Sequence, residues 1–416
     1  MKKRIISAFA FASLLSTSAS AGVTVTDNGG SNYNPLQTAI PSLSIAPDAT
    51  CGGMGDVGAA TAPDNNSQHW NPSKYALAES RGGVSISYTP WLRKIVDDID
   101  LVYLAGYYKP SERTAVGASF RYFNMGKINL TGTPDAFGVP QDLGTAQPYE
   151  MAFDGSFSMM LGETKKHEGK WSAGVALRFI YSDLFNGMSD EDEYSKAKAF
   201  GADISCAYRK ENMNLGEHTG EVGFGIAITN IGNKVSYDND ASQQFIPTNF
   251  RIGGNFIYAF DDYNRLGIAL DFNKLLVPTP YGSKSDYETD EEYEEAKKNY
   301  EECSSIGGIF KSLGDAPGGF KEEMKEFNFG VGLEYSYAKK FMVRAGYSNE
   351  SEEKGNRKYF TVGAGFHLMI FELNAAYLIS IAQTNPLDRT LRFTLGFDLG
   401  GIKALFGSND ADATGL

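Results

Sequence analysis

Side chains that could carry out chemistry are few in this chain of 416 residues, and they stand far apart. The four histidines are too dispersed to indicate a metal site or a catalytic triad; they are His69, His167, His218 and His367. The Gly-x-Ser-x-Gly pattern, which holds a serine nucleophile on a sharp turn in many hydrolases, does not occur. We therefore predict that the chain is not an enzyme and has no catalytic residue, metal site or cofactor.

One glycine cluster has a spacing that could bind a nucleotide. Gly53, Gly55 and Gly58 fit the loop that holds the pyrophosphate of a dinucleotide, but that loop needs a strand before it and a helix after it. The surrounding residues predict neither element. We therefore expect these glycines to let the backbone pack tightly against its surroundings.

The net charge and the cysteines limit the partners and sites that the chain could have. The formal net charge of -13 argues against a nucleic-acid partner, because the phosphate backbone attracts basic surfaces. Cys51, Cys206 and Cys303 are odd in number and widely separated. They predict neither a disulfide framework nor a zinc site.

The elements that must position these side chains begin after an export signal. Residues 1–21 have a basic start, an apolar run from Ile5 to Leu15 and the small-residue exit Ala19-Ser20-Ala21, which together predict a cleavable signal peptide. No later apolar stretch approaches the about 18–20 residues that a membrane-spanning helix needs. We therefore expect the mature chain either to be soluble outside the inner membrane or to cross the outer membrane as a barrel.

About fourteen short segments then alternate apolar with small or polar residues, which is typical of β-strands with one apolar face. Their expected starts are Gly82, Ile99, Arg113, Tyr149, Lys170, Lys198, Thr219, Thr248, Arg265, Phe327, Phe341, Lys358, Phe371 and Arg389. The mean hydropathy of -0.30 is compatible with a barrel, since half of its strand residues face a watery lumen. We predict an all-β fold: a 14-stranded antiparallel transmembrane β-barrel of the outer membrane.

The connections support this topology, because short and long ones alternate as periplasmic turns and outer loops do. Two inner links, 162–169 and 210–218, are longer than ideal. The longest outer loop, 274–326, is acidic, and its stretch 291–302 predicts a helix.

Residues before the first strand do not alternate and are rich in Gly, Pro and Asn, which favours a plug folded into the lumen. The expected organisation is a signal peptide at 1–21, an N-terminal plug at 22–80, the barrel at 81–400 and a C-terminal tail at 401–416.

Charged side chains on the inward face are expected to pair with one another and with the plug. By alternation the inward set is Arg121, Arg178, Arg251, Arg265, Arg344, Arg392, Asp154, Asp203, Asp271, Glu334, Glu372 and Asp398. We also place Val102, Leu104 and Tyr108 inward, which would leave some apolar surface in the lumen for a lipid or detergent.

The segment His69-Trp70-Asn71-Pro72-Ser73 resembles the hatch motif of the FadL family, barrels of fourteen strands with an N-terminal plug. Longer blocks in the same order are similar to the PorV family of the Bacteroidota type IX secretion system; they are 41–49, 52–56, 70–75, 87–93 and 273–280. The resemblance covers nearly the whole mature chain. It assigns the plug motif to Gly53, Gly55, Trp70, Asn71 and Pro72.

The resemblance implies a non-enzymatic role. PorV-like proteins bind secreted cargo with a C-terminal signal domain at the translocon barrel and deliver it to a sortase-like attachment complex, which joins the cargo to surface lipopolysaccharide. The alternative is a FadL-like transporter of long-chain fatty acids or other hydrophobic molecules. Such a transporter needs an apolar lumen, so the inward Arg, Asp and Glu side chains favour the secretion role.

Trp91, Leu92, Arg93 and Ile95 form an apolar and basic tip in the first outer loop. We predict this tip as a candidate contact with a partner or cargo. Anchoring of the strand end in the headgroup region by Trp91 and Arg93 is the alternative.

Overall fold

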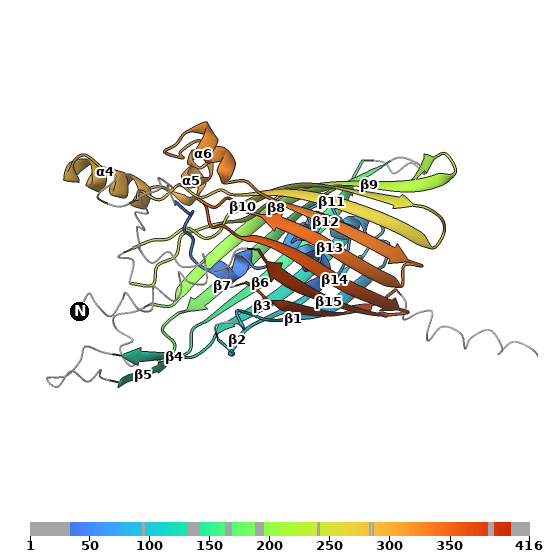
Figure 1. Cartoon of the computed structure of the whole chain (residues 1–416), viewed down its shortest axis with the longest axis horizontal. Helices are drawn as coiled ribbons and strands as arrows, with labels where there is room; N and C mark the ends of the chain where they lie inside the picture. The colour runs from blue at the N-terminus through green and yellow to red at the C-terminus, as the bar shows by residue number, and fades with distance from the viewer. Residues whose placement is uncertain are drawn as a thin grey trace, which may run out of the picture.

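The fold is a closed antiparallel β-barrel. A computed structural model describes residues 34–93, 96–131, 142–162, 169–187, 195–238, 242–282, 284, 287–381 and 387–400. Within these residues fourteen strands form one ring, in which neighbours in the chain pair with each other and β1 pairs with β16 to close it (Figure 1). The predicted fold class is confirmed.

The strands of the ring have the following bounds: β1 (Gly82–Pro90), β2 (Ile99–Tyr108), β3 (Thr114–Met125), β6 (Tyr149–Leu161), β7 (Lys170–Asp183), β8 (Ala197–Leu215), β9 (His218–Gly232), β10 (Asn249–Ala259), β11 (Asn264–Leu275), β12 (Asn328–Tyr337), β13 (Phe341–Asn349), β14 (Lys358–Leu368), β15 (Phe371–Ser380) and β16 (Leu391–Asp398). Each begins within two residues of its predicted start. The short turns lie at one end and the long loops at the other, so the long loops mark the outer end.

One inner link is shorter than predicted. β8 continues to Leu215 and turns back at Gly216 and Glu217, where φ of Gly216 is 84°. This two-residue hairpin replaces the predicted link 210–218. The register of β8 shifts between Lys210 and Met213, and this bulge interrupts the alternation by which a strand is recognised in the sequence.

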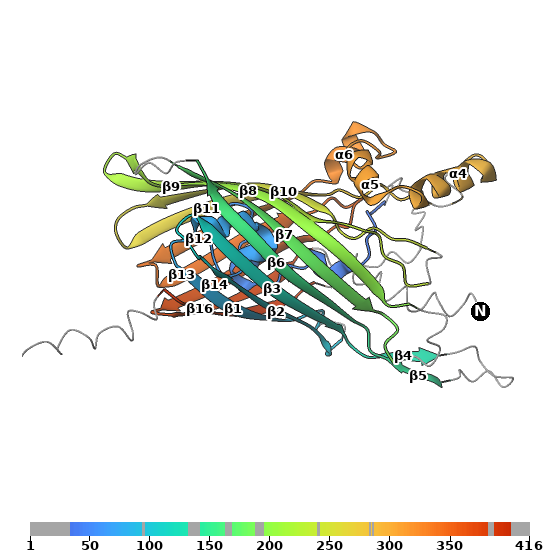
Figure 2. The same ribbon diagram turned by 180° about the vertical axis from the view of Figure 1, so that it is seen from behind.

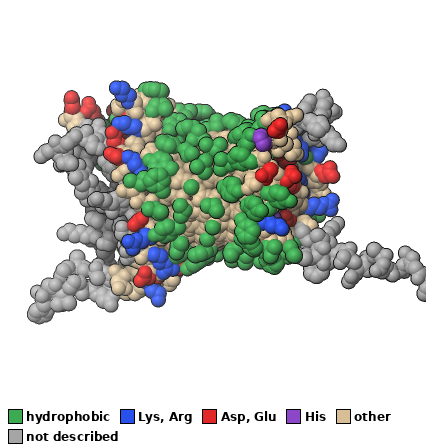
Figure 3. Space-filling model, turned by 45° about the vertical axis from the view of Figure 1, so that its right-hand side comes forward, with side chains coloured by type: hydrophobic (Ala, Val, Ile, Leu, Met, Phe, Trp, Pro, Cys, Tyr) green, Lys and Arg blue, Asp and Glu red, His purple; other side chains and the backbone are tan. Residues whose placement is uncertain are grey.

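The strands present an apolar face to the lipid. On β12, for example, Leu333, Tyr335 and Tyr337 are exposed, whereas Gly330 and Gly332 are buried against the interior. The space-filling view shows hydrophobic side chains gathered around the middle of the barrel, with charged side chains toward its two ends (Figure 3). This band between polar rims places the protein in the outer membrane.

The direction of side chains on β2 is opposite to the predicted one. Leu104 and Tyr108 are 48% and 51% exposed on the outside, and Val102 shares their face, whereas Leu101 and Tyr103 are buried. Both faces of this strand are apolar, so alternation alone does not say which one points inward. The pairing with β1 and β3 decides it. The apolar lumen surface predicted from these residues is therefore not formed by them.

Residues 34–80, which we call the luminal segment, lie inside the barrel (Figures 1 and 2). They form four short helices: η1 (Pro41–Ser44), α2 (Ala49–Gly52), α3 (Ser67–Trp70) and η2 (Pro72–Leu77). The Asn34 N–H donates to the Glu353 carbonyl among the outer loops, and the Ser80 hydroxyl bonds to Asp398 at the inner end. The segment therefore runs through the lumen from end to end.

Three predicted parts of the chain lie outside the described residues. They are the signal peptide at 1–21, residues 22–33 of the plug and the tail at 401–416.

The luminal segment supplies an apolar core to the outer half of the barrel. Ile40 and Leu43 pack into a buried cluster with inward side chains of the wall, which include Leu101, Phe123 and Ile180. Burying each such side chain stabilises the arrangement by about 1.5–3 kcal/mol. The chain's own side chains thus occupy part of the apolar interior that a transporter would need.

The outer loop between β11 and β12 carries three helices in its described residues: α4 (Asp290–Glu301), α5 (Ser305–Lys311) and α6 (Phe320–Lys325). α4 matches the helix predicted at 291–302. It begins with a capping box, in which the side chains of Thr289 and Glu292 each bond the backbone N–H of the other residue.

A small two-stranded sheet, β4 (Ile128–Thr131) with β5 (Asp142–Ala146), stands in the outer loop between β3 and β6. It was not predicted, because strands of four and five residues give too short an alternation to recognise. Among the described helices, none combines the length and the hydropathy needed to cross a membrane.

Contact between the wall and the luminal segment can be tested at Gly346 on β13. A Cβ atom there would overlap the backbone of Met54 and Gly55. We expect Gly346→Val to displace the luminal segment and raise the ion conductance of the purified barrel in planar bilayers, while heat-modifiable migration on gels shows that the barrel still folds.

Gly155→Val is the matched control for this experiment, because no atom lies within 4 Å of a Cβ built at Gly155. Equal conductance of the two variants would contradict the close contact at Gly346.

Candidate functional site

The aromatic and amide residues of the plug motif fasten the luminal segment in place. The Trp70 side chain is buried, and its indole N–H donates to Oδ2 of Asp48 at 2.6 Å. The Asn71 amide donates to the Cys206 carbonyl of β8 at 3.1 Å, which ties the segment to the wall. Pro72 starts η2, where its missing N–H would have no helical partner. These contacts are structural, and a functional role for the motif stays a prediction.

The glycines of the motif lie where the luminal segment touches the wall. A Cβ at Gly53 would stand 3.1 Å from Cα of Gly363, and one at Gly55 would stand 2.7 Å from the carbonyl oxygen of Tyr347. Gly55 also has φ of 74°, which favours glycine. A dinucleotide loop has a strand before its glycines and a helix directly after them. Within the described residues 34–66 these glycines follow α2, and no helix comes after them, so they do not form such a loop.

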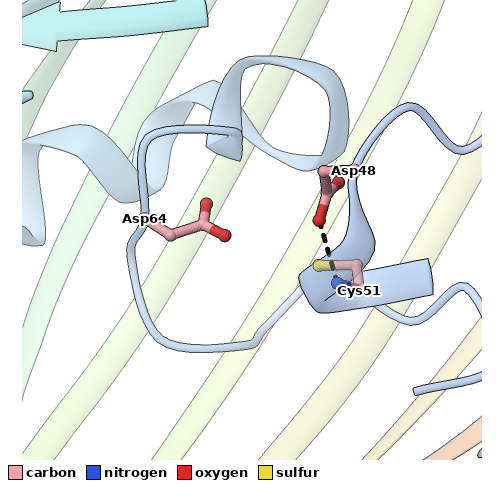
Figure 4. A group of neighbouring side chains, drawn as sticks. All are labelled: Asp48, Cys51 and Asp64. Carbon is pink, nitrogen blue, oxygen red and sulfur yellow. Dashed lines mark hydrogen bonds between the residues drawn. The ribbon is translucent and has the colours of Figure 1, made fainter. Parts of the chain in front are cut away.

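Three side chains that could bind a metal meet in the luminal segment: Asp48, Cys51 and Asp64 have oxygen or sulfur atoms within 4.8 Å of one another (Figure 4). Asp48 caps α2 by accepting from the Cys51 N–H at 2.9 Å, and Asp64 accepts from the Ser67 hydroxyl. Because these carboxylates already accept hydrogen bonds that fold the segment, we assign no metal to them.

Inward charges form ion pairs, as expected from the sequence. Arg178 Nε lies 2.6 Å from Asp154 and its Nη2 lies 3.0 Å from Asp203. Arg392 bonds Asp56 of the luminal segment at 2.8 Å. Two further pairs are Arg344 with Glu334 and Arg265 with Glu221. Pairing compensates the cost of burying these charges, so they hold the interior together.

A cavity of 170 Å³ remains in the outer half of the lumen. One part of its lining is apolar and includes Leu43, Trp91 and Leu275. Another part carries guanidinium groups, with Arg251 stacked on the ring of Trp70 at 4.6 Å. The cavity is therefore amphipathic, and it lies between the luminal segment and the first outer loop.

The predicted partner contact in the first outer loop faces the wrong way for a docking surface. Trp91 and Leu92 are only 4% and 6% exposed, and they belong to the same buried cluster as Leu43. Arg93 pairs with Asp100 at 2.9 Å. Ile95 lies outside the described residues, and contact of this tip with a partner stays a prediction that would require the loop to turn outward.

Among the described outer-loop residues, exposed apolar side chains gather instead on α5, α6 and the turn between them. Sequence reasoning missed them, although the spacing of Ile306, Phe310 and Leu313 puts all three on one helical face. We call the following five residues the α5–α6 surface: Ile306, Phe310, Leu313, Phe320 and Met324.

An ion-pair cluster holds α6 against the rim of the barrel. Nζ of Lys274 lies 2.6 Å from both Glu323 and Glu326. Nζ of Lys354, from the loop between β13 and β14, lies 2.6 Å from Glu322 and 3.1 Å from Glu326. All five side chains are buried, so we call them the rim cluster.

The lysines of the rim cluster keep its buried glutamates ionised. Burial opposes ionisation of Glu322, but hydrogen bonds from Lys354 and the Gly318 N–H, together with the Lys354 charge, outweigh it and lower the pKa of Glu322. Glu326 bridges the two lysines, and one network therefore joins β11, α6 and the loop after β13.

Comparison with protein families identifies the chain. A profile described as "Type IX secretion system protein PorV" matches residues 28–282, more than half of the sequence. The chain belongs to the PorV family. It is therefore an outer-membrane component of the type IX secretion system, as the sequence blocks had predicted. A search of curated proteins finds no match.

Several solved structures are similar to this PorV-family chain. They include the Pseudomonas putida toluene transporter TodX, at 9% identity and a TM-score of 0.45 over 88% of this chain and 98% of that one. The Ralstonia pickettii toluene transporter TbuX is 11% identical, with a TM-score of 0.42 over 84% and 96%. A Pseudomonas aeruginosa FadL homologue is 9% identical, with a TM-score of 0.42 over 88% and 99%. Identities this low carry no information on function.

Trp91 is expected to lock the outer end of the luminal segment. Trp91→Ser removes a large buried side chain, which typically costs about 3–5 kcal/mol. We expect faster hydrogen exchange at residues 39–45, measured by mass spectrometry on the purified barrel. Trp171→Ser is the control, since Trp171 lies exposed on the barrel exterior. Unchanged exchange in the Trp91 variant would show that the loop does not hold the segment.

Lys354 is expected to hold the α5–α6 region on the rim. Lys354→Met leaves Glu322 without its lysine, and breaking a buried pair typically costs about 3–5 kcal/mol. We expect limited proteolysis to cut within 305–325 at least tenfold faster, with the barrel intact. Lys358→Met removes an ion pair to the exposed Glu352 and should have little effect. Equal cleavage of both variants would argue against the cluster.

Proposed function

We propose that this PorV-family barrel binds cargo bearing a C-terminal signal domain at the type IX translocon and delivers it to a sortase-like attachment complex. The observation that carries the proposal is that the lumen is occupied lengthwise by residues 34–80. A barrel filled in this way can offer its loops and exterior to other proteins without conducting cargo through its own interior.

Other features support a binding role. The ion pairs described above join wall strands to each other or, as with Arg392 and Asp56, join the wall to the luminal segment. In this proposal the chemistry of attachment belongs to the partner complex. The apolar outer band keeps the protein in the bilayer that also holds lipopolysaccharide, the acceptor implied by the family. The protein thus stands where exported cargo and surface acceptor meet.

A FadL-like transporter remains the second candidate, because the outer cavity combines an apolar wall with arginines. Its volume of 170 Å³ is below the about 300–1,000 Å³ of most ligand pockets. A second cavity of 350 Å³ at the inner end reaches that range, but charged side chains such as Arg209, Glu221 and Arg265 line it. Passage of a long-chain molecule would also require the apolar cluster around Leu43 to be displaced. The secretion role therefore has the stronger support.

Deletion of the gene separates the two functions. On the secretion role, we expect cargo with intact C-terminal signal domains to accumulate in the periplasm and to be lost from the cell surface, as measured by surface proteolysis and immunoblotting. Complementation with the Gly155→Val variant should restore attachment. Normal surface attachment without the protein would overturn the proposal, and reduced uptake of a labelled long-chain fatty acid would then favour the transporter.

A further inference from the structure

We propose that the α5–α6 surface is immersed in the outer leaflet of the membrane, where its apolar side chains meet the acyl chains of lipopolysaccharide and Lys311 and Lys321 bind the phosphates of lipid A. The proposal goes beyond the function proposed above and does not depend on it, because it assigns to the outer loop a contact with lipid and not a contact with cargo.

α6 lies on the outward side of the barrel wall. Along β11 the lipid-facing residues Leu270 and Phe272 are 38% and 40% exposed, and alternation makes Lys274 the next residue of that face. Lys274 is only 1% exposed, because Glu323 and Glu326 of α6 lie 2.6 Å from its Nζ. α6 therefore covers the wall about 7 Å along the strand from Phe272, where the apolar band ends.

α5 and α6 stand to the side of the barrel and not over its lumen. Both ribbon views show α6 outside the outline of the strands, with α5 beside it, at the end of the barrel that carries the long loops (Figures 1 and 2). Because the wall is surrounded by lipid, helices in this position lie where the acyl chains of the outer leaflet give way to headgroups.

The α5–α6 surface has the apolar groups that an interfacial segment needs. Its five side chains are between 50% and 78% exposed. Ile306 and Phe310 are four residues apart on α5, as are Phe320 and Met324 on α6, so each pair shares one face of its helix. Exposed apolar groups beside a lipid-covered wall are typical of a segment that lies in the membrane interface.

The charged side chains exposed beside these apolar groups are basic. Within residues 305–325, all of which are described, they are Lys311 and Lys321. The acids of this stretch are turned away: Glu322 and Glu323 are buried in the rim cluster, and Asp315 accepts from a backbone N–H of the same loop. Lysines that border an apolar face complement the anionic headgroups of a membrane surface, and their long side chains can reach the phosphates.

The acidic side chains of the loop stand apart on α4. Asp290, Glu291, Glu294 and Glu295 are exposed there, and both ribbon views show α4 farther from the strands than α5 and α6 (Figures 1 and 2). Separation of this kind keeps the carboxylates away from the lipid phosphates, which would repel them. The loop thus has a basic and apolar part beside the leaflet and an acidic part in water.

The opposite side of the α5–α6 region is firmly attached. The rim cluster holds α6 through Lys274 and Lys354. Gly308 of α5 packs so closely on Phe245 and Pro278 that a Cβ there would lie 2.9 Å from the first and 3.0 Å from the second. A surface held by buried ion pairs and close packing is preorganised, which reduces the entropy cost of binding.

Site-specific photo-crosslinking in intact cells tests the lipid contact. A benzoyl-phenylalanine placed at Phe310 or Phe320 is expected to give an adduct with lipopolysaccharide, detected by immunoblotting as a species of slower migration. The same group at the exposed Glu295 of α4 is the control from the same loop, and it should give about tenfold less of this adduct, since a residue outside the interface rarely meets acyl chains. An equal yield at Glu295, adducts at Phe310 and Phe320 with proteins alone, or no adduct would overturn the proposal.

Charge reversal tests the role of the two lysines. Lys311→Glu with Lys321→Glu should lower the lipopolysaccharide adduct at Phe310 by roughly fivefold or more, because lysines near an anionic membrane surface are attracted to it and glutamates are repelled. Lys298→Glu, at an exposed position of α4, is the matched control and should leave the yield unchanged. Heat-modifiable migration of every variant checks that the barrel is folded. An unchanged yield after reversal at 311 and 321 would overturn the assignment of the phosphates to these lysines.

Discussion

Satisfaction of every backbone hydrogen bond within the bilayer is the constraint on which the structure depends. Hydrocarbon offers no partner to an unpaired N–H or C=O, so a sheet in a membrane must close on itself. Here the closure is the pairing of β1 with β16, with partners that run from Gly83 opposite Asp398 to Tyr88 opposite Phe393. Once the ring is closed, each strand has one face in lipid and one in the lumen, and the two faces need opposite chemistry.

The lumen of this barrel is packed like a protein interior and is not an open, water-filled pore. Its outer half is an apolar core built around Ile40 and Leu43, and its polar side chains form ion pairs such as Arg178 with Asp154 and Asp203. The Asp271 carboxylate accepts from the backbone N–H groups of Gly58 and Ala59, which joins the wall to the luminal segment. Wall and segment therefore stabilise each other, and neither is complete without the other.

The sequence predicted the barrel well because lipid imposes a period of two on every strand. It predicted the facing of β2 wrongly, since Val102 and Leu104 alternate with the equally apolar Leu101 and Tyr103, and only pairing with neighbouring strands sets their direction. It placed Trp91 outside, because residue type does not show which way a loop turns. The α5–α6 surface was missed for a related reason: apolar spacing in a short helix is the same whether its face meets a core or water.

One feature of the luminal segment constrains how the molecule can be assembled. The segment passes lengthwise through the barrel, from Asn34 beside Glu353 to Ser80 beside Asp398, and its Asn65 amide reaches the Val84 carbonyl of β1. Threading it into a finished cylinder would require bulky groups such as Trp70 to pass between fixed ion pairs. An open, curled sheet that wraps around the segment avoids that barrier, which makes the seam between the first and last strands the natural place for the final step of biogenesis.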